Sequence, residues 1–291
     1  MTEPQTRTLD VPGGTIAYDV RDDAAGRGRH RALVMAGFPM DATGFASLAA
    51  HFRDRVVVTY DPRGTGRSTR PAGEGPSTPV DHAADLHALI TALGMGPVDV
   101  LGSSGGAVTG LALVAAHPDQ VHTLVAHEPP VAAVLPDRDQ QLTALADVHE
   151  TYQRRGTGPA MAKFLTLIGR RGPLPADFAA LPAPDPADFG LPTRDDGRRD
   201  DPMLGQSILT TAQYEPDFAA LARASTRIRI AAGVESEGEM MARAAAGVAE
   251  RLGTELAIFP GGHGGFLGGE FGQHGDPEDF AAALRRLLDE R

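Results

Sequence analysis

The sequence Gly-Ser-Ser-Gly-Gly at 102–106 restricts the local fold more than any other part of this chain. The apolar run Val98–Leu101 has the length of a buried strand, and the residues from 106 to 115 have a helical pattern. A serine between a strand and a helix needs a turn so tight that the residues two positions away carry no side chain, and both are glycine here. We therefore predict that Ser104 lies on a sharp turn and acts as a nucleophile. A glycine- and serine-rich connecting loop is the alternative.

Strand-like apolar runs alternate with helix-like segments along most of the chain. This pattern predicts an α/β fold with a mostly parallel sheet that is covered by helices on both faces. The predicted strands are Thr15–Asp19, Ala32–Met35, Val56–Tyr60, Val98–Leu101, Thr123–Ala126, Ile228–Ala231 and Glu255–Phe259. The predicted helices are Asp81–Leu93, Gly106–Ala115, Met240–Leu252 and Glu278–Asp289.

Residues 129–225 interrupt this alternation. Their first half predicts helices at Gln140–Arg154 and Ala160–Ile168, whereas Gly172–Asp201 is rich in Pro, Asp and Arg. A long stretch of this composition inside a compact domain is expected to be a lid or a linker. We interpret the chain as a core of residues 1–128 and 226–291 with a cap inserted at 129–225.

Composition excludes several classes of function. The 291 residues contain 27 Lys and Arg against 38 Asp and Glu, a formal charge of −11, which argues against nucleic acid or an anionic membrane as the main partner. Cysteine is absent, so disulfides, thiolate metal sites and a cysteine nucleophile are excluded. No signal-peptide pattern or membrane-length apolar run is visible, and we expect a soluble, cytoplasmic protein.

His263 is the second candidate catalytic residue. It lies in the glycine-rich segment Phe259–Phe266, directly after the last predicted strand. A histidine on such a loop can reach a serine at the same sheet edge and act as its general base. The alternative is a surface or packing histidine. No pair among the other nine histidines has convincing metal-ligand spacing.

A third candidate element follows the second predicted strand. Backbone N–H groups of Phe38 or Gly37, together with that of Gly105, are positioned in the sequence to form an oxyanion hole. A plain turn at this point is the alternative.

Together these residues resemble the α/β-hydrolase superfamily over essentially the whole chain. The similarity rests on Gly37-Phe38-Pro39, the Asp-Pro-Arg-Gly-Thr-Gly-Arg-Ser loop at 61–68, the turn around Ser104, the inserted cap and Gly262-His263. The resemblance implies eight mostly parallel strands, no metal or organic cofactor, and hydrolysis through an acyl-enzyme. The loop at 61–68 is more often structural than catalytic in this superfamily.

The expected triad acid departs from the usual pattern of the superfamily. Most relatives carry Asp in a G-x-x-D turn, but here the turn is Gly233-Val234-Glu235-Ser236, with Ser236 in the acid position. Glu128, at the end of the strand after the Ser104 helix, is the predicted acid, and Glu235 is the alternative. The His-Glu-x-Pro spacing is similar to that of lactonases that open macrolactones. A structural pairing of Glu128 with an arginine is the other interpretation.

The expected function is hydrolysis of a carboxylic ester or lactone of a hydrophobic small molecule by Ser104, His263 and Glu128. The cap, Phe38 and Met40 are expected to shape the substrate pocket. C–C bond cleavage, thioester cleavage or perhydrolysis with the same triad remain alternatives, as does a binding protein that has lost turnover. Serine at the turn argues against halide displacement and epoxide opening. We expect a monomer or homodimer.

Overall fold

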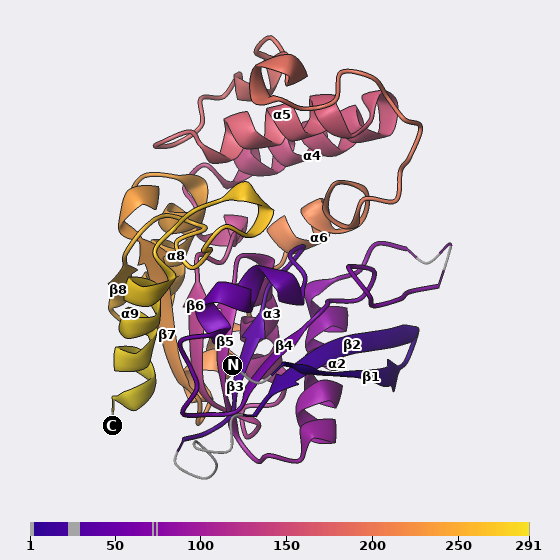
Figure 1. Cartoon of the computed structure of the whole chain (residues 1–291). Coiled ribbons are helices and arrows are strands. Elements are labelled where there is room, and N and C mark those ends of the chain that lie inside the picture. Colours follow the sequence, from indigo (N-terminus) through magenta and orange to yellow (C-terminus); the bar gives the residue numbers. More distant parts are fainter. Residues whose placement is uncertain (1–2, 23–29, 72, 74, 291) are drawn as a thin grey trace.

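The computed structural model describes residues 3–22, 30–71, 73 and 75–290, in which one eight-stranded sheet forms the centre (Figure 1). The strands follow the order β1-β2-β4-β3-β5-β6-β7-β8. Their bounds are β1 Gln5–Val11, β2 Gly14–Arg21, β3 Leu33–Ala36, β4 Val57–Tyr60, β5 Val98–Ser103, β6 Val121–His127, β7 Arg227–Gly233 and β8 Leu256–Phe259. The fold class predicted from the sequence is confirmed.

Most of the sheet is parallel. Strands β4, β3, β5, β6, β7 and β8 pair in parallel, while β2 pairs antiparallel with both β4 and β1. Because parallel strands all end at one edge of a sheet, the loops after β3, β5, β6 and β8 emerge together. The candidate site residues Phe38, Ser104, Glu128 and His263 follow these four strands.

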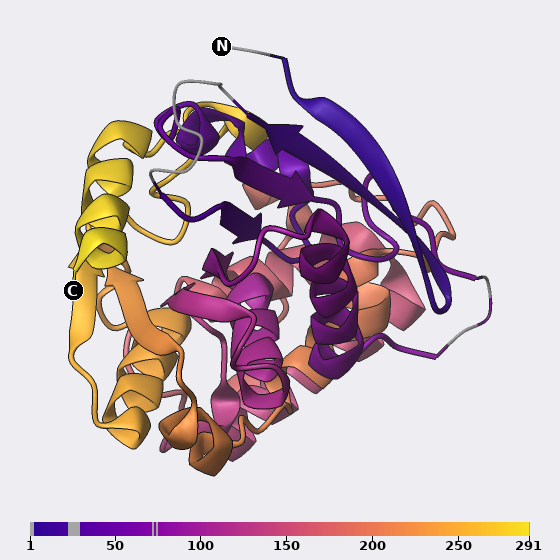
Figure 2. The same ribbon diagram turned by 90° about the horizontal axis from the view of Figure 1, so that it is seen from below.

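Helices cover both faces of the sheet, as Figure 2 shows from below. Helices α2 (Pro79–Leu93), α3 (Gly105–Ala116) and α8 (Met240–Leu252) pack their apolar side chains into the larger core cluster on one face. Helices α1 (Ala46–Ala49) and α9 (Pro277–Asp289) pack into a second cluster on the other face. Leu101 of β5 lies in this second cluster and Val100 in the first, the alternation expected of a strand buried on both sides.

Residues 129–225 lie between β6 and β7, and their helices α4 (Arg138–Arg155) and α5 (Thr157–Ile168) stand above the carboxyl edge of the sheet (Figure 1). These two helices share an apolar cluster with α6 (Ile208–Ala212) that is separate from the two sheet clusters. The last helix of the segment, α7 (Phe218–Arg223), packs instead against α3 and α8. The segment is therefore cap-like in its middle and joined to the sheet layer at its end.

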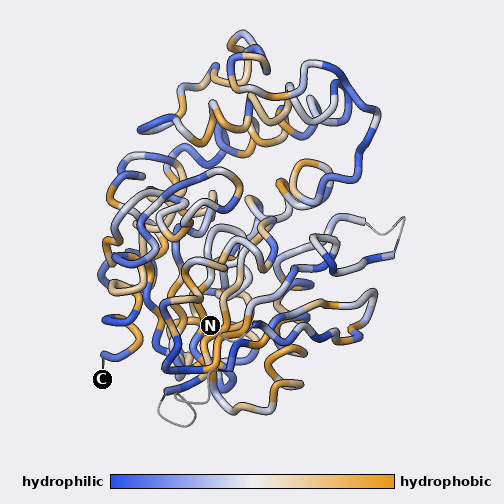
Figure 3. Tube along the Cα trace, viewed as in Figure 1, coloured by the Kyte–Doolittle hydropathy of each residue, from blue (hydrophilic) through white to orange (hydrophobic). Residues whose placement is uncertain are grey.

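The stretch from 172 to 201 contains two 3-10 turns, Phe178–Ala180 and Pro186–Phe189. A π-helix at Pro202–Ser207 follows and leads into α6. Figure 3 shows the chain that descends from the cap to α6 as predominantly hydrophilic. Asp137 joins this segment to the sheet layer by accepting from Arg243 of α8, and it also accepts from the backbone N–H of Leu174 within the segment. No helix in the described ranges is long and apolar enough to cross a membrane.

Candidate active site

Ser104 lies on a strained turn between β5 and α3. Its φ of 56° and ψ of −124° place a non-glycine residue in a sparsely populated backbone region. A Cβ atom on Gly102 would lie 2.5 Å from the carbonyl oxygen of Gly106, and one on Gly106 would collide with the carbonyl oxygen of Ala36. The two glycines are therefore required where β5 and the first turn of α3 meet β3. This geometry agrees with the turn that was expected around Ser104.

The backbone of Phe38 lies directly against Gly105. A Cβ atom on Gly105 would be 3.0 Å from the carbonyl oxygen of Phe38. The N–H of Gly105 belongs to the first turn of α3, where N–H groups have no acceptor inside the helix. Gly37 packs against Met40, whose Cε atom lies 2.8 Å from where a Cβ on Gly37 would be. The structure thus brings Phe38 and Gly105 together.

Glu128 and His263 form a hydrogen-bonded pair in which the carboxylate is buried and the imidazole is partly exposed. The Nδ1 atom of His263 lies 2.5 Å from Oε2 of Glu128, and the N–H of Gly233 donates to Oε1 at 2.9 Å. Glu128 is fully buried, and its own N–H donates to the carbonyl oxygen of Ala231 at 2.9 Å. Strand β7, which supplies Ala231 and Gly233, therefore fixes the position of a side chain that follows β6.

Charge in this pair is set by competing effects. Burial by itself would raise the pKa of Glu128, but the hydrogen bond from His263, the charge interactions with His127 and His263, and the N–H of Gly233 together outweigh burial and lower this pKa to about 2. The carboxylate is consequently ionised at neutral pH. An ionised acceptor at Nδ1 keeps the proton on that nitrogen, which leaves Nε2 of His263 as the basic atom.

Ser104 and Glu128 follow the neighbouring strands β5 and β6. The N–H of Ser104 donates to the carbonyl oxygen of His127, the residue before Glu128, at 3.0 Å. Within the described residues no hydrogen bond joins the Ser104 hydroxyl to His263. Catalytic hydrogen bonds of this kind are often long without substrate and shorten in the substrate complex.

Glu235 is close to the histidine loop but does not bind His263. Its backbone N–H donates to Gly261, and its Oε2 atom lies 3.9 Å from where a Cβ on Gly262 would be. The side chain is exposed, and no hydrogen bond from it to His263 is present in the described part of the chain. Ser236, in the position where most relatives have the acid, is buried with its hydroxyl unpartnered among the described residues. Of the two candidate acids, the structure brings Glu128 to the histidine.

His127 lies beside this pair and had no role in the sequence interpretation. Its ring is fully buried and packs edge-on against Phe266 and Phe280, at 6.2 Å from the ring of His263. Burial lowers the pKa of His127 to about 4, so the ring is neutral at physiological pH. His127 therefore supplies packing to the site without adding positive charge next to Glu128.

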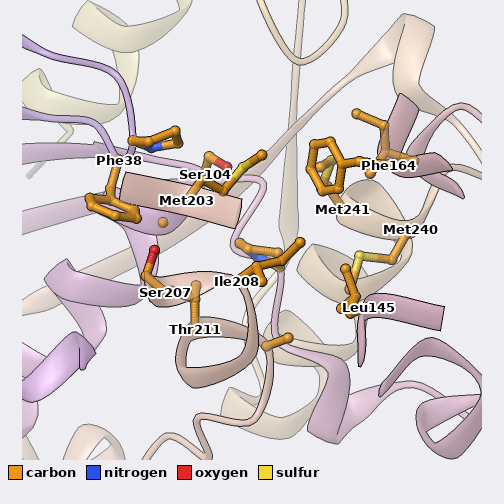
Figure 4. A pocket seen from close by; sticks show the side chains of 15 residues that line it. Phe38, Ser104, Leu145, Phe164, Met203, Ser207, Ile208, Thr211, Met240 and Met241 are labelled. Carbon is orange, nitrogen blue, oxygen red and sulfur yellow. The ribbon is translucent and has the colours of Figure 1, made fainter. Parts of the chain in front are cut away.

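An apolar cavity opens onto Ser104 (Figure 4). It encloses about 510 Å³ including its mouth, and Phe38, Ser104 and Gly105 form part of its wall. The opposite wall comes from the cap and from α8: Leu145, Phe164, Ile168, Met203, Ser207, Ile208, Thr211, Ala212, Met240 and Met241. No charged side chain is among these lining residues. Phe38 lines the cavity as expected, but Met40 does not.

The cavity residues of α6 and α8 were not predicted from the sequence. Helix α6 is too short to show a clear hydrophobic period in the sequence. The residues Met240 and Met241 give no indication in the sequence that the cap will cover them. The described residues contain no group of three or more His, Asp or Glu that could hold a metal ion.

The chain belongs to the α/β-hydrolase fold family, whose family model matches residues 33–213. It is 32% identical over 274 residues to the uncharacterised hydrolase YraK of Bacillus subtilis (strain 168), with 89% of each chain covered. A shorter match, 39% identical and covering 34% of this chain and 37% of the relative, is to the putative carbamate hydrolase RutD of Caulobacter segnis.

Solved structures share the fold at low sequence identity. A thermophilic esterase from Thermogutta terrifontis superposes with a TM-score of 0.66 at 19% identity, with 99% of this chain and 98% of that chain covered. The enol-lactonase of Burkholderia xenovorans LB400 gives 0.64 at 17% identity, with 98% and 100% covered. The comparisons confirm the family and the broad expectation of a hydrolase.

Proposed function

We propose that this protein is a serine hydrolase that cleaves a carboxylic ester or lactone through an acyl-enzyme. The observation that carries the proposal is the hydrogen-bonded Glu128–His263 pair at the sheet edge where Ser104 lies on its strained turn. A nucleophile, a histidine and a carboxylate that orients it are the three parts that acyl transfer to water requires.

The mechanism follows from these positions. The hydroxyl oxygen of Ser104 attacks the substrate carbonyl carbon while Nε2 of His263 takes its proton, and the carboxylate of Glu128 stabilises the imidazolium through Nδ1. The N–H groups of Phe38 and Gly105 donate to the oxyanion, each worth on the order of 10²–10³ in rate. His263 then protonates the leaving alkoxide. His263 next takes a proton from water, whose oxygen attacks the acyl carbon. The bond from that carbon to the Ser104 oxygen then breaks, His263 returns the proton to this oxygen, and the carboxylic acid is released.

The cavity supports an uncharged, mostly apolar substrate. Its lining carries no charge, and a charged group would lose its hydration there without gaining a partner. The esterase and the enol-lactonase among the similar structures support an ester or lactone bond, although their likeness concerns the fold. Thioester and C–C cleavage and perhydrolysis use the same triad and stay as alternatives that a substrate panel separates.

Covalent labelling tests the proposal. An activated aryl phosphonate is expected to add once to the wild-type protein and to stop its hydrolysis of 4-nitrophenyl esters, whereas Ser104→Ala is expected to show neither the adduct by mass spectrometry nor turnover. Ser103→Ala is the matched control, because this neighbouring serine ends β5 and is buried. Full labelling of Ser104→Ala would contradict the assignment of the nucleophile. Absence of both label and turnover in the wild type would favour a binding protein.

A further inference from the structure

The cavity in front of Ser104 has two unlike ends. In the view of Figure 4, Phe38 and Ser207 lie on one side of Ser104, Thr211 lies below it beside Ile208, and Phe164, Leu145 and the methionines of α8 lie on the other side. The end formed by Phe164, Leu145 and the methionines is entirely apolar, and its methionines can adapt to chains of varied shape. Ser207 and Thr211 bring two hydroxyl groups to an otherwise apolar part of the wall.

The two hydroxyls differ in what they offer a ligand. Ser207 ends the π-helix Pro202–Ser207, and its hydroxyl donates to the carbonyl oxygen of Pro202 at 2.8 Å. Toward a ligand, the Ser207 hydroxyl can therefore act as a hydrogen-bond acceptor. The hydroxyl of Thr211 makes no hydrogen bond to any described residue, so it can donate. The two residues lie on either side of the junction between the π-helix and α6, and both line the cavity.

Thr210, next to Thr211, shows the contrast within one helix. Its hydroxyl donates to the carbonyl oxygen of Ser77 at 2.6 Å and lies 3.2 Å from that of Ser207. Thr210 does not line the cavity and ties the cap to the loop before α2. One threonine of α6 therefore has a structural partner, and its neighbour faces the cavity without one.

We propose that Ser207 and Thr211 form a subsite for an uncharged secondary amide group of the substrate, with the alkyl part of the substrate at the methionine end. An amide matches this pair because its N–H can donate to Ser207 while its carbonyl oxygen accepts from Thr211. A purely alkyl substrate would remove the Thr211 hydroxyl from water and give it no partner. Sites that hydrogen-bond a substrate group discriminate against analogues that lack it. This inference rests on the proposed esterase function.

Two nearly isosteric esters test the subsite: 4-nitrophenyl N-acetyl-β-alaninate, which contains the amide, and 4-nitrophenyl 5-methylhexanoate, which does not. The measured quantity is the ratio of kcat/KM for the amide ester to kcat/KM for the alkyl ester. Thr211→Val is expected to lower this ratio by about threefold to tenfold, the usual range for one neutral hydrogen bond. Thr211→Ser keeps the hydroxyl and is expected to restore the ratio.

Thr210→Val is the matched control, because it makes the same substitution one residue away. It is expected to lower the midpoint of thermal unfolding by removing the bond to Ser77, and to leave the ratio within about twofold of wild type. A ratio that Thr211→Val does not change, or that both variants change equally, overturns the subsite alone. A wild-type protein that cleaves neither ester contradicts the proposed function, and the subsite with it.

Discussion

Glu128 has a backbone conformation that few glutamates adopt, because its φ of 50° lies in the left-handed region. Two bonds to β7 hold it there: its N–H donates to Ala231, and the N–H of Gly233 donates to its side chain. Strain of this kind persists only where the surrounding structure fixes it, and it is common at functional sites. At the scale of single residues, both Ser104 and the acid proposed for it are held in this way.

We expect Glu128→Gln to lower turnover by about 10⁴ while the fold remains intact. The amide oxygen of the new side chain would accept from Gly233, which turns its NH2 group toward Nδ1 of His263. The imidazole would then carry its proton on Nε2, the atom that must accept the proton of Ser104. Steady-state kinetics and thermal unfolding measure the two quantities.

Glu235→Gln is the control for this prediction. Its side chain is exposed and is not hydrogen-bonded to His263 among the described residues, so we expect little change in turnover. A large loss in Glu235→Gln with near-normal turnover in Glu128→Gln would transfer the role of the acid to Glu235.

At the scale of secondary-structure elements, residues 129–225 are proposed to act as a lid. The segment from 172 to 201 is largely exposed, and its turns hold only short-range hydrogen bonds over much of its length. We expect trypsin to cut first after Arg194 or Arg198, and a phosphonate bound at Ser104 to slow that cleavage. Mass spectrometry of the early fragments locates the cuts.

Arg7 is an internal control in the same digest. Arg7 is also exposed, but it lies on β1 and pairs there with Tyr18 of β2. Early cleavage at Arg7, with the segment from 172 to 201 intact, would contradict the proposed lid.

The sequence was sufficient to predict the positions of the strands that are buried on both faces. Strands such as β5 and β6 are almost continuously buried and contain short runs of apolar residues, so their positions were predicted to within a few residues. Strand β1 was missed because it is an edge strand whose residues are mostly exposed, and its polar side chains resemble a loop. Helix α2 begins at Pro79, two residues earlier than predicted, because Thr78 and Asp81 form a capping box there.

Ser104, His263 and Glu128 could be proposed from the sequence because each directly follows a recognisable strand. The substrate end of the site could not be proposed in the same detail. Met203, Ser207 and Thr211 meet the cavity only through the way in which the cap lies on the sheet, and local sequence pattern carries no information on that arrangement.

At the scale of the whole molecule, two buried neutral histidines make the fold sensitive to acid. Burial lowers the pKa of both His82 and His127 to about 4, against 6.5 for the unfolded chain. Below pH 6.5 the unfolded state binds protons that the folded state does not, so stability is lost as the pH falls from 6.5 toward 4. Each histidine contributes at most about 1.4 kcal/mol per pH unit in this window.

His127→Phe is expected to reduce this slope, since phenylalanine suits the surrounding aromatic cluster and does not titrate. Urea unfolding from pH 8 to pH 4 provides the free energies. Between pH 7 and 8 both histidines are neutral in the folded and in the unfolded state. In this range the free energies of unfolding of the wild type and of His127→Phe are expected to change with pH in the same way. An unchanged slope between pH 6.5 and 4 would show that His127 is not buried in its neutral form.

The cap leaves the sheet after β6 and returns to it at β7, and these two strands are hydrogen-bonded neighbours, with His127 opposite Ala231. Because β6 and β7 are parallel, the segment leaves the carboxyl end of β6 but re-enters at the amino end of β7, where Arg227 is opposite Thr123. Helix α7, which packs against α3 and α8, carries the chain back along the sheet layer to that end. We therefore expect that a foreign cap could replace the part between Glu128 and α7 without altering the spacing of Ser104, Glu128 and His263, provided that α7 and the contacts of Glu128 with β7 are retained. Such an exchange would replace the cavity wall that the cap supplies and would leave Phe38, Met240 and Met241 in place.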